Sequence, residues 1–244
     1  MGERWFVAPP DSWREGEVLL PPEEAHHARH VLRVGELDVI TVTDGQGRVA
    51  RCAVGAAEGD GLRAEILESE RHRRLHPQVV VYQGAAKGSK IEDVVEKLAE
   101  LGVAETWVYE SARSIVRWDE GKRARLNERW ASVARAAAKQ SRNSFVMTTG
   151  GGLGFDDLVE RVRTEPQAVV LWEEASLPLR TALHDMSDRV ALVVGPEGGL
   201  ERGEAEALAD AGGQLVSLGP RILRTENAAV VCAAALFFHY GLIG

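Results

Sequence analysis

Three short segments, each following an apolar run, combine bare turns with charged side chains. They are LWEE at Leu171 to Glu174, GPEGG at Gly195 to Gly199, and LGPRILRTEN at Leu218 to Asn227. Glycine-rich turns leave main-chain N–H and C=O groups open to a ligand, while Arg and Glu can stabilise charge or move a proton. Gly and Pro punctuate most loops, but two such turns beside an Arg-rich one favour a binding site.

Known nucleotide-binding fingerprints do not fit these turns. GPEGG lacks the Gly-x-Gly-x-x-Gly order. GAAKGSK, at Gly84 to Lys90, has too few residues before its second Gly and carries Ser where a P-loop requires Lys. We therefore expect a ligand whose binding needs few phosphate-binding groups.

Histidines near the amino terminus raise the question of a metal site. His26 and His30 are spaced by one helical turn, with His27 beside them. A third ligand is missing and there is no His-Glu-x-x-His motif, so we expect no metal and assign these residues to packing or RNA contact.

The elements that position the turns fall into two regions. Up to about Arg74, short strands at 39–43, 48–55 and 62–68 are joined by tight turns, which predicts a small β-barrel or sandwich. The basic linker RHRRLHP ends in Pro77 and marks a boundary. We therefore predict one domain at 1–73 and a second at 74–244.

Strands and helices alternate in the second region. Strands are predicted at 79–82, 106–109, 168–172, 190–194 and 214–218. Helices are predicted over 89–101, with a capping box that starts at Ser89, over 127–140, over 225–240, and after the GPEGG turn. Repeated strand–helix units predict an α/β fold with a mostly parallel sheet, whose ligands bind outside the carboxyl ends of the strands.

Composition narrows the class of protein. The net charge is -8, yet the charged residues of 113–142 are mostly Lys and Arg, whereas those of 143–210 are mostly Asp and Glu. The chain holds 2 cysteines, outside any Cys-x-x-Cys spacing, and the first residues lack an export signal. The longest apolar run is too short to cross a bilayer. We expect a cytoplasmic protein without a membrane partner.

Several motifs together resemble one family along nearly the whole chain. They are GPEGGLERGE (195–204), LGPRILRTENA (218–228), KGSKIEDVVEKLAELGV (87–103), ARAAAKQSRN (134–143) and HVLRVGELDVITVTDGQG (30–47). In this combination and order they are similar to the ribosomal RNA small-subunit methyltransferase E family, within the SPOUT superfamily. That family usually has Ser where Glu201 stands and Thr where Asn227 stands.

The resemblance implies both a fold and an activity. The implied fold is a PUA-like β-barrel followed by a SPOUT-type, mostly parallel sheet whose carboxyl-terminal end forms a trefoil knot. The implied activity is S-adenosylmethionine-dependent methylation of N3 of one uridine in 16S rRNA of the small ribosomal subunit. The resemblance also implies that the enzyme is a homodimer.

By the same analogy, the three turns form a cofactor cradle that works chiefly through main chain. Its members are Leu171, Trp172, Glu173, Gly195, Pro196, Glu197, Gly198, Leu218, Gly219, Ile222 and Leu223.

Methylation of N3 requires loss of the imide proton and stabilisation of charge on the uracil. We expect Arg224 to hold the anionic uracil, with Glu197 or Glu226 orienting it or relaying the proton. The alternative is that Arg224 and Glu226 only form an ion pair at a helix end.

Residues expected to contact RNA are mostly basic. They are Arg29, Arg33, Lys87, Lys90, Arg113, Arg135, Gln140 and Arg142. Each one alone is more often a solvated surface charge, and only the set as a whole favours RNA contact. Two other functions remain open: a methyltransferase that acts on another rRNA or tRNA base, and a ribosome-assembly factor that binds RNA without turning over the cofactor.

Overall fold

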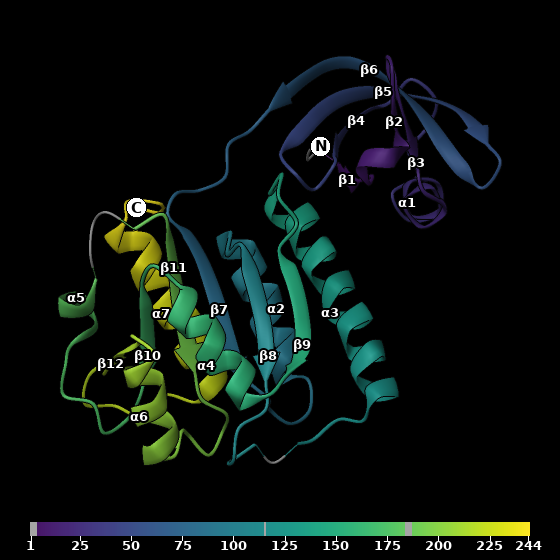
Figure 1. Ribbon diagram of the computed structural model, residues 1–244. Coiled ribbons are helices and arrows are strands. Elements are labelled where there is room, and N and C mark those ends of the chain that lie inside the picture. Colours follow the sequence, from purple (N-terminus) through teal and green to yellow (C-terminus); the bar gives the residue numbers. More distant parts are fainter. Residues whose placement is uncertain (1–3, 115, 184–186) are drawn as a thin grey trace. The chain divides into compact units, whose positions relative to one another are not determined.

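Two six-stranded sheets organise the chain. Figure 1 shows the computed structural model. The structure describes residues 4–114, 116–183 and 187–244. Tertiary contacts divide the chain into two units. The amino-terminal unit comprises Met1–Arg74 and Ala138–Val146, and the carboxyl-terminal unit comprises Leu75–Ala137 and Met147–Gly244.

The amino-terminal sheet has the strand order β1-β4-β5-β6-β3-β2. Its strands are β1 (Trp5–Val7), β2 (Trp13–Arg14), β3 (Glu17–Leu20), β4 (Val39–Thr43), β5 (Arg48–Glu58) and β6 (Gly61–Arg71). Short helical segments are η1 (Pro10–Ser12), α1 (Pro22–His26) and the π-helical η2 (His27–Val31). Irregularities in the β5–β6 pairing fit the curl of the sheet, because bulges bend a strand and increase its twist.

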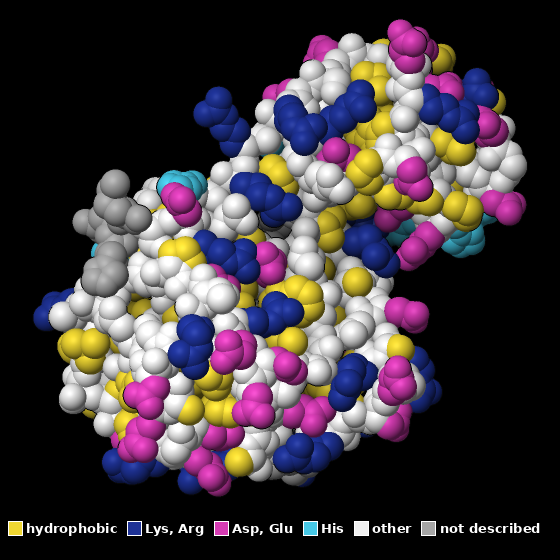
Figure 2. Space-filling view, in the orientation of Figure 1, with side chains coloured by type: hydrophobic (Ala, Val, Ile, Leu, Met, Phe, Trp, Pro, Cys, Tyr) yellow, Lys and Arg dark blue, Asp and Glu magenta, His cyan; other side chains and the backbone are white. Residues whose placement is uncertain are grey.

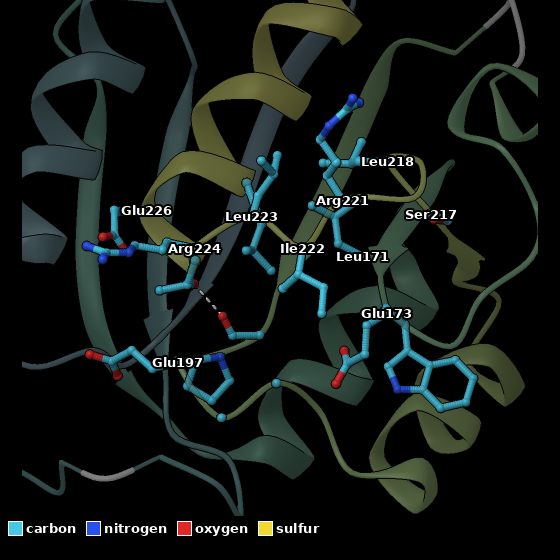
Figure 3. Close-up of a pocket in the computed structure, with 18 of the residues that line it drawn as sticks. Leu171, Glu173, Glu197, Ser217, Leu218, Arg221, Ile222, Leu223, Arg224 and Glu226 are labelled. Atoms are coloured by element: carbon cyan, nitrogen blue, oxygen red, sulfur yellow. Dashed lines mark hydrogen bonds between the residues drawn. The ribbon is translucent and has the colours of Figure 1, made fainter.

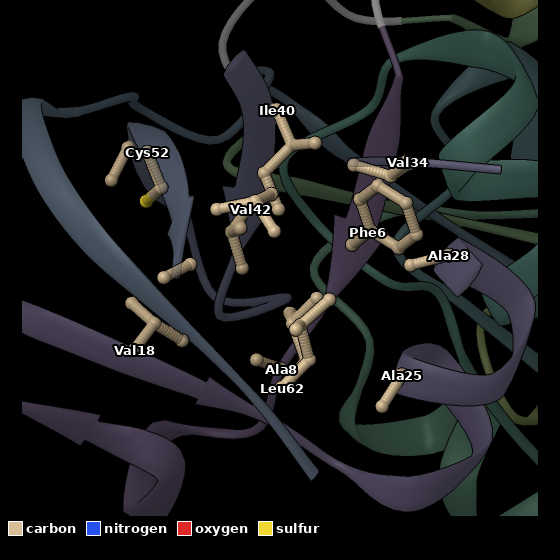
Figure 4. Close-up of a cluster of buried hydrophobic side chains, with 14 residues drawn as sticks. Phe6, Ala8, Val18, Ala25, Ala28, Val34, Ile40, Val42, Cys52 and Leu62 are labelled. Atoms are coloured by element: carbon tan, nitrogen blue, oxygen red, sulfur yellow. The ribbon is translucent and has the colours of Figure 1, made fainter. Parts of the chain in front are cut away.

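Alternating side chains of these strands form one core. Figure 4 shows Phe6, Val18, Ile40, Val42 and Leu62 converging, and all of them are buried. The predicted hairpin of β4 and β5 is confirmed. Its turn is stabilised by the Asp44 side chain, whose Oδ1 accepts hydrogen bonds from the main-chain N–H groups of Gln46 and Arg48.

The segment 138–146 packs with the amino-terminal unit, although the sequence analysis assigns it to the second domain. The Thr43 hydroxyl donates to the Ser144 carbonyl at 2.8 Å. The main-chain N–H of Val146 donates to the Gly45 carbonyl, and Lys139 forms an ion pair with Glu24 at 2.7 Å. These contacts join positions that are far apart in sequence, so local patterns carry no signal for them.

The sheet of the carboxyl-terminal unit is entirely parallel, in the order β12-β10-β11-β7-β8-β9. Its strands are β7 (Gln78–Gly84), β8 (Glu105–Tyr109), β9 (Thr148–Leu153), β10 (Ala168–Leu171), β11 (Arg189–Val194) and β12 (Gln214–Val216). The central strands are buried on both faces, which explains their continuous apolar sequences. The predicted α/β class with a parallel sheet is confirmed.

Helices cover both faces of this sheet. They are α2 (Lys90–Leu101), α3 (Glu120–Ser141), α4 (Phe155–Thr164), α5 (Leu179–Ala182), α6 (Arg202–Asp210) and α7 (Thr225–His239). Side chains of α4 and α6 pack with those of β7, β10 and β11 in one core cluster. Helices α2 and α7 pack against each other on the opposite face (Figure 1).

Two local predictions need correction. Helix α2 begins and ends as predicted, with Gly102 in the left-handed conformation, but the Ser89 side chain makes no capping hydrogen bond. The reason is its backbone, which has ψ 3° instead of the extended geometry that aims a cap at the next turn. Helix α3 starts at Glu120 rather than Asn127.

Strand β9 and helix α4 are absent from the sequence prediction. The sequence TTGGGL has little strand propensity, but its glycines allow close packing. A Cβ at Gly150 would lie 2.4 Å from the Trp107 ring, and one at Gly151 would lie 2.6 Å from the Trp130 ring. None of the helices in the described ranges is long and apolar enough to span a membrane.

Candidate functional site

A pocket of about 760 Å³ lies at the carboxyl ends of β10, β11 and β12, which are neighbours in the sheet (Figure 3). The turns that follow these strands supply most of its walls, and the starts of α7 and α2 supply the rest. The structure therefore brings together the three segments that the sequence analysis selected.

Every residue predicted for the cofactor or for catalysis lines this pocket. The set is Leu171, Trp172, Glu173, Gly195, Pro196, Glu197, Gly198, Leu218, Gly219, Ile222, Leu223, Arg224 and Glu226. Lys90, which is predicted to contact RNA, also lines the pocket. The lining residues without any predicted role are Val194, Gly199, Val216, Ser217, Pro220, Arg221, Thr225 and Ala228.

A buried hydrogen-bonded link joins the pocket turns to the sheet. The Thr225 hydroxyl donates to the Gly195 carbonyl at 2.5 Å, the contact drawn in Figure 3, and accepts from the Gln83 side-chain amide at 2.8 Å. Gln83 and Thr225 are both buried. A polar residue at the end of the apolar run VVVYQ is a sequence signal that could have identified Gln83.

Strand β7 also approaches the turn after β11 closely. A Cβ placed on Gly84 would lie 2.3 Å from the main-chain nitrogen of Pro196, which no side chain could tolerate. The turn at residues 195–199 therefore rests directly on the backbone of β7. Such a rigid support preorganises the main-chain groups of the turn.

One part of the pocket, which we call the cradle, consists of the turns at 171–173 and 217–223 with the main chain of 195–199. Ile222 lies on its wall and is 90% exposed. In the described part of the chain, the main-chain N–H groups of Ile222 and Leu223 donate to no other group. The cradle thus offers an uncovered apolar side chain beside open main-chain donors.

The other part, which we call the charged end, consists of Lys90, Glu197, Arg224 and Glu226. Figure 3 shows Glu197, Arg224 and Glu226 on one side of the pocket and Glu173 on the other. The Lys90 ammonium lies 3.1 Å from Oε1 of Glu197 and 4.0 Å from Oε2 of Glu226. One lysine is therefore shared between two carboxylates.

Glu197 is held as an anion. Burial alone would raise its pKa, but the main-chain N–H of Lys87 and the Lys90 ammonium both donate to Oε1 and hold the pKa of Glu197 below its ordinary value. The second oxygen, Oε2, is buried and has no hydrogen-bond partner in the described part of the chain.

Arg224 stands at the N-cap position of α7 and is exposed. It forms no ion pair with Glu226 or with any other residue that the structure describes, so the alternative of a helix-terminal ion pair receives no support. A guanidinium in this position remains open to a ligand.

The two departures from the family pattern lie beside the pocket turns. Glu201 is the N-cap residue of α6, and its main-chain N–H donates to Glu204 at 2.9 Å. Its carboxylate lies 3.6 Å from Arg113. Asn227 is exposed in the first turn of α7, and its main-chain N–H donates to the Arg224 carbonyl.

The residues predicted to contact RNA are divided between the two units. Lys87, Lys90 and Arg113 lie around the turn at 195–199, because the first two contact Glu197 and Arg113 donates to the Gly198 carbonyl at 3.1 Å. Arg135 is exposed on α3. The members in the amino-terminal unit are Arg29, Arg33, Gln140 and Arg142.

Positive and negative charges are mixed on the visible surface (Figure 2). Figure 2 shows Lys and Arg side chains interspersed with Asp and Glu on the visible face. Arg29 donates to the Gly61 carbonyl, and Arg33 is exposed with a positive φ of 51°. Among the described residues, no group of three His, Cys, Asp or Glu side chains could hold a metal ion.

The pocket lies across adjacent strand ends of a parallel sheet. This position places the protein among the α/β proteins that bind a small ligand at the carboxyl edge of the sheet. Residues 73–237 match the RNA methyltransferase domain family, and residues 20–67 match the RNA methyltransferase PUA domain family. Curated relatives named ribosomal RNA small subunit methyltransferase E are 31% and 37% identical to this chain, so the chain belongs to that family.

Curated relatives of that name are similar over most of their length. The Mycobacterium tuberculosis protein is 37% identical over 90% of this chain and 85% of its own. The Bacillus subtilis protein is 31% identical over 91% of this chain and 90% of its own.

Solved structures agree. A methyltransferase from Legionella pneumophila in complex with the bound cofactor SAM has a TM-score of 0.89 at 26% identity, covering 98% of both chains. Ribosomal RNA small subunit methyltransferase E from Neisseria gonorrhoeae, bound to S-adenosylmethionine, has a TM-score of 0.86 at 27% identity, also covering 98% of both chains.

Proposed function

We propose that this enzyme uses S-adenosylmethionine to methylate N3 of one uridine in 16S rRNA of the small ribosomal subunit. The family relationship makes it an S-adenosylmethionine-dependent RNA methyltransferase. The observation that carries the finer assignment is the pocket itself, in which an apolar cradle with open main-chain donors adjoins an end that holds one free guanidinium and two carboxylates.

The residues present fit this cofactor. An adenine ring could cover Ile222, which otherwise exposes 90% of its surface, and could accept hydrogen bonds from the open N–H groups of the 218–223 turn. Leu171, Trp172, Leu218, Gly219 and Leu223 would complete this binding surface. Glu173 is an exposed carboxylate on the same wall and could accept hydrogen bonds from ribose hydroxyls.

When bound, the cofactor supplies an electrophilic methyl group on a positively charged sulfur. The protein contributes position and charge. Arg224 is the group that faces negative charge on the uracil, because its guanidinium has no ion-pair partner among the described residues and lines the pocket. Gly195, Pro196 and Gly198 present main chain to the bound groups.

RNA recognition would use both units. Lys87 and Arg113 flank the pocket turn and could hold the backbone around the target base, since Lys and Arg position nucleic acid chiefly through phosphates. Further RNA contacts would come from Arg29, Arg33, Arg135, Gln140 and Arg142. The curled amino-terminal sheet would act as a PUA-like barrel in this role.

The family resemblance also supports three further proposals. The carboxyl-terminal unit would contain a trefoil knot, the enzyme would work as a homodimer, and it would act in the cytoplasm, where ribosomal subunits are made. The exposed Val231 and Phe238 of α7 favour a protein–protein contact on that helix. Light scattering coupled to size exclusion tests the dimer directly.

The test of the function is product identification. Small ribosomal subunits that lack the modification are incubated with the enzyme and labelled S-adenosylmethionine, and the methylated nucleoside is identified by mass and chromatography. We expect 3-methyluridine at one position of 16S rRNA. Label in another nucleoside would contradict the N3 assignment, and cofactor binding without label in any ribosomal or transfer RNA would favour the assembly factor.

A further inference from the structure

The two carboxylates at the charged end stand in different environments. Oε1 of Glu197 accepts hydrogen bonds from two donors, the main-chain N–H of Lys87 and the ammonium of Lys90, each at 3.1 Å. The Glu226 carboxylate accepts no hydrogen bond from the described residues, because its ion-pair partner, the Lys90 ammonium, lies 4.0 Å away, beyond hydrogen-bond distance. The two residues therefore do not have interchangeable roles.

Glu197 is unsuited to accept a proton. Its two donors stabilise the charged form, and its pKa lies below the ordinary value, which makes it a weak base. Its contact with Lys90 fixes that side chain next to Glu226. Glu197 is therefore a positioning residue that acts through Lys90.

Glu226 has a free acceptor that faces the pocket. Its Oε2 is buried and has no hydrogen-bond partner in the described ranges, and its side chain is 16% exposed. Oε2 of Glu197 is also buried without a partner, but Oε1 of Glu197 is held by two donors, whereas the Glu226 carboxylate accepts no hydrogen bond from the described residues. A buried carboxylate oxygen without a donor is costly, so such an atom in a ligand pocket indicates a donor on the ligand. Uracil presents one acidic donor of this kind, its N3–H.

We propose that Glu226 is the proton acceptor for the uridine N3–H, and that Glu197 and Lys90 position it. The inference rests on the function proposed above. In the step, the N3–H bond breaks and the proton moves to Glu226. N3 then bonds to the methyl carbon, and the electron pair of the carbon–sulfur bond leaves with sulfur, which becomes neutral.

The charged groups around Glu226 fit this role. Lys90 comes from α2, Glu197 from the turn after β11, and Arg224 from the residue before α7. The Lys90 ammonium places a positive charge 4.0 Å from Oε2 of Glu226. Arg224 balances the negative charge that uracil gains when the proton leaves.

The experiment compares Glu226→Gln with Glu197→Gln, and uses Glu206→Gln on the exposed face of α6 as the matched control. Single-turnover methylation of small subunits at saturating S-adenosylmethionine is measured against pH, and cofactor affinity is measured by calorimetry. We expect Glu226→Gln to lower the rate at neutral pH by about 10²–10⁴-fold, the usual contribution of a general base. The Glu206→Gln rate should equal that of wild type.

The pH profile separates a base from a structural residue. The rate difference between wild type and Glu226→Gln should decrease toward alkaline pH, because uracil N3 ionises there without a protein base. Glu197→Gln should lower the rate less, by an amount that varies little with pH. A Glu226→Gln rate equal to wild type, or a deficit that is constant across pH, would overturn the proposal.

Cofactor affinity tests the competing role of Glu226, binding of the cofactor's ammonium group. Calorimetry should give a dissociation constant for Glu226→Gln within about threefold of wild type, because a free-energy change of 0.6 kcal/mol or less corresponds to that ratio. A large loss of affinity that accounts for the whole rate defect would assign Glu226 to the cofactor and overturn the proposal. Measured affinity also shows that the variant is folded.

Substrate acidity supplies a second, independent readout. Subunits assembled from RNA transcribed with 5-fluorouridine carry a more acidic N3–H, so they should restore Glu226→Gln relative to wild type. If 5-fluorouridine changes the rates of wild type and Glu226→Gln by the same factor, Glu226 is not the proton acceptor. The identity of the wild-type product distinguishes the two proposals. If wild type yields a product other than 3-methyluridine, the proposed function is wrong; if wild type yields 3-methyluridine and Glu226→Gln behaves as wild type does, the assignment of Glu226 as proton acceptor is wrong.

Discussion

The cradle and the charged end of the pocket differ in how they are built. The cradle presents main chain and apolar side chains from turns that directly follow β10, β11 and β12. The charged end depends on side chains that come from α2, the turn after β11, and the region where α7 begins. A cofactor common to many enzymes can be held by backbone, whereas the chemistry needs specific side chains. Substitutions should therefore separate binding from turnover.

After Glu226→Gln, the largest effect on the rate is expected from Arg224→Ala. Loss of a preorganised group that stabilises charge in the transition state costs about 10²–10³ in rate. Cofactor affinity should stay within a few-fold, because Arg224 is exposed and belongs to the charged end. Single-turnover kinetics and calorimetry measure the two quantities. Normal turnover in this variant would remove Arg224 from the mechanism and break the comparison.

The next effect concerns the link that both ends share. Thr225→Val removes the hydroxyl between the Gln83 amide and the Gly195 carbonyl, and leaves buried polar groups without partners. This should lower the free energy of unfolding by about 1–3 kcal/mol and weaken both cofactor binding and turnover. Thr148→Val, at an exposed position of β9, is the control in thermal and urea unfolding. A variant as stable as that control would show that the link is dispensable.

A smaller effect is expected at the cradle. Ile222→Ala should leave stability unchanged, because the side chain is 90% exposed. Cofactor affinity should fall by about 1 kcal/mol, roughly fivefold, for the apolar contact that is lost. Leu37→Ala, at a residue of the amino-terminal unit that is 81% exposed, is the matched control. Unchanged calorimetric affinity in Ile222→Ala would place the adenine elsewhere.

The smallest effect is a pH dependence of stability at the charged end. The folded pKa of Glu197 lies below its ordinary value of 4.5, because two donors outweigh the effect of burial. The ion pair with Lys90 therefore contributes stability at pH above about 4.5, and this contribution is lost as pH falls through the lowered pKa. In acid, urea unfolding of wild type should lose stability more steeply than that of Glu197→Gln. If the free energies of unfolding of wild type and Glu197→Gln fall equally with decreasing pH, the Lys90–Glu197 ion pair does not stabilise the fold.

The sequence predicts the cradle better than the charged end. Strands with continuous apolar residues and the glycine-rich turns after them are local features, so both the parallel sheet and the meeting of three turns follow from their positions. Lys90 shows the limit, since the sequence analysis expects it to contact RNA, whereas its ammonium, at the start of α2, lies 3.1 Å from Glu197. That contact depends on tertiary packing.

Other features escape prediction for similar physical reasons. Strand β9 contains Gly150 and Gly151, whose value lies in the space that they leave for tryptophan rings rather than in strand propensity. The short strands β1, β2 and β3 have too few residues to show a period. The placement of 138–146 with the amino-terminal unit depends on long-range hydrogen bonds such as that from Thr43 to Ser144.

The central claim is that the cradle binds the cofactor and the charged end supports methyl transfer. Its most direct test is the single-turnover methylation rate as a function of S-adenosylmethionine concentration for wild type, Ile222→Ala and Arg224→Ala. We predict that Ile222→Ala raises the half-saturating concentration and keeps the maximal rate, while Arg224→Ala lowers the maximal rate and keeps the half-saturating concentration. If both variants change both quantities in equal proportion, the pocket does not divide its work in this way.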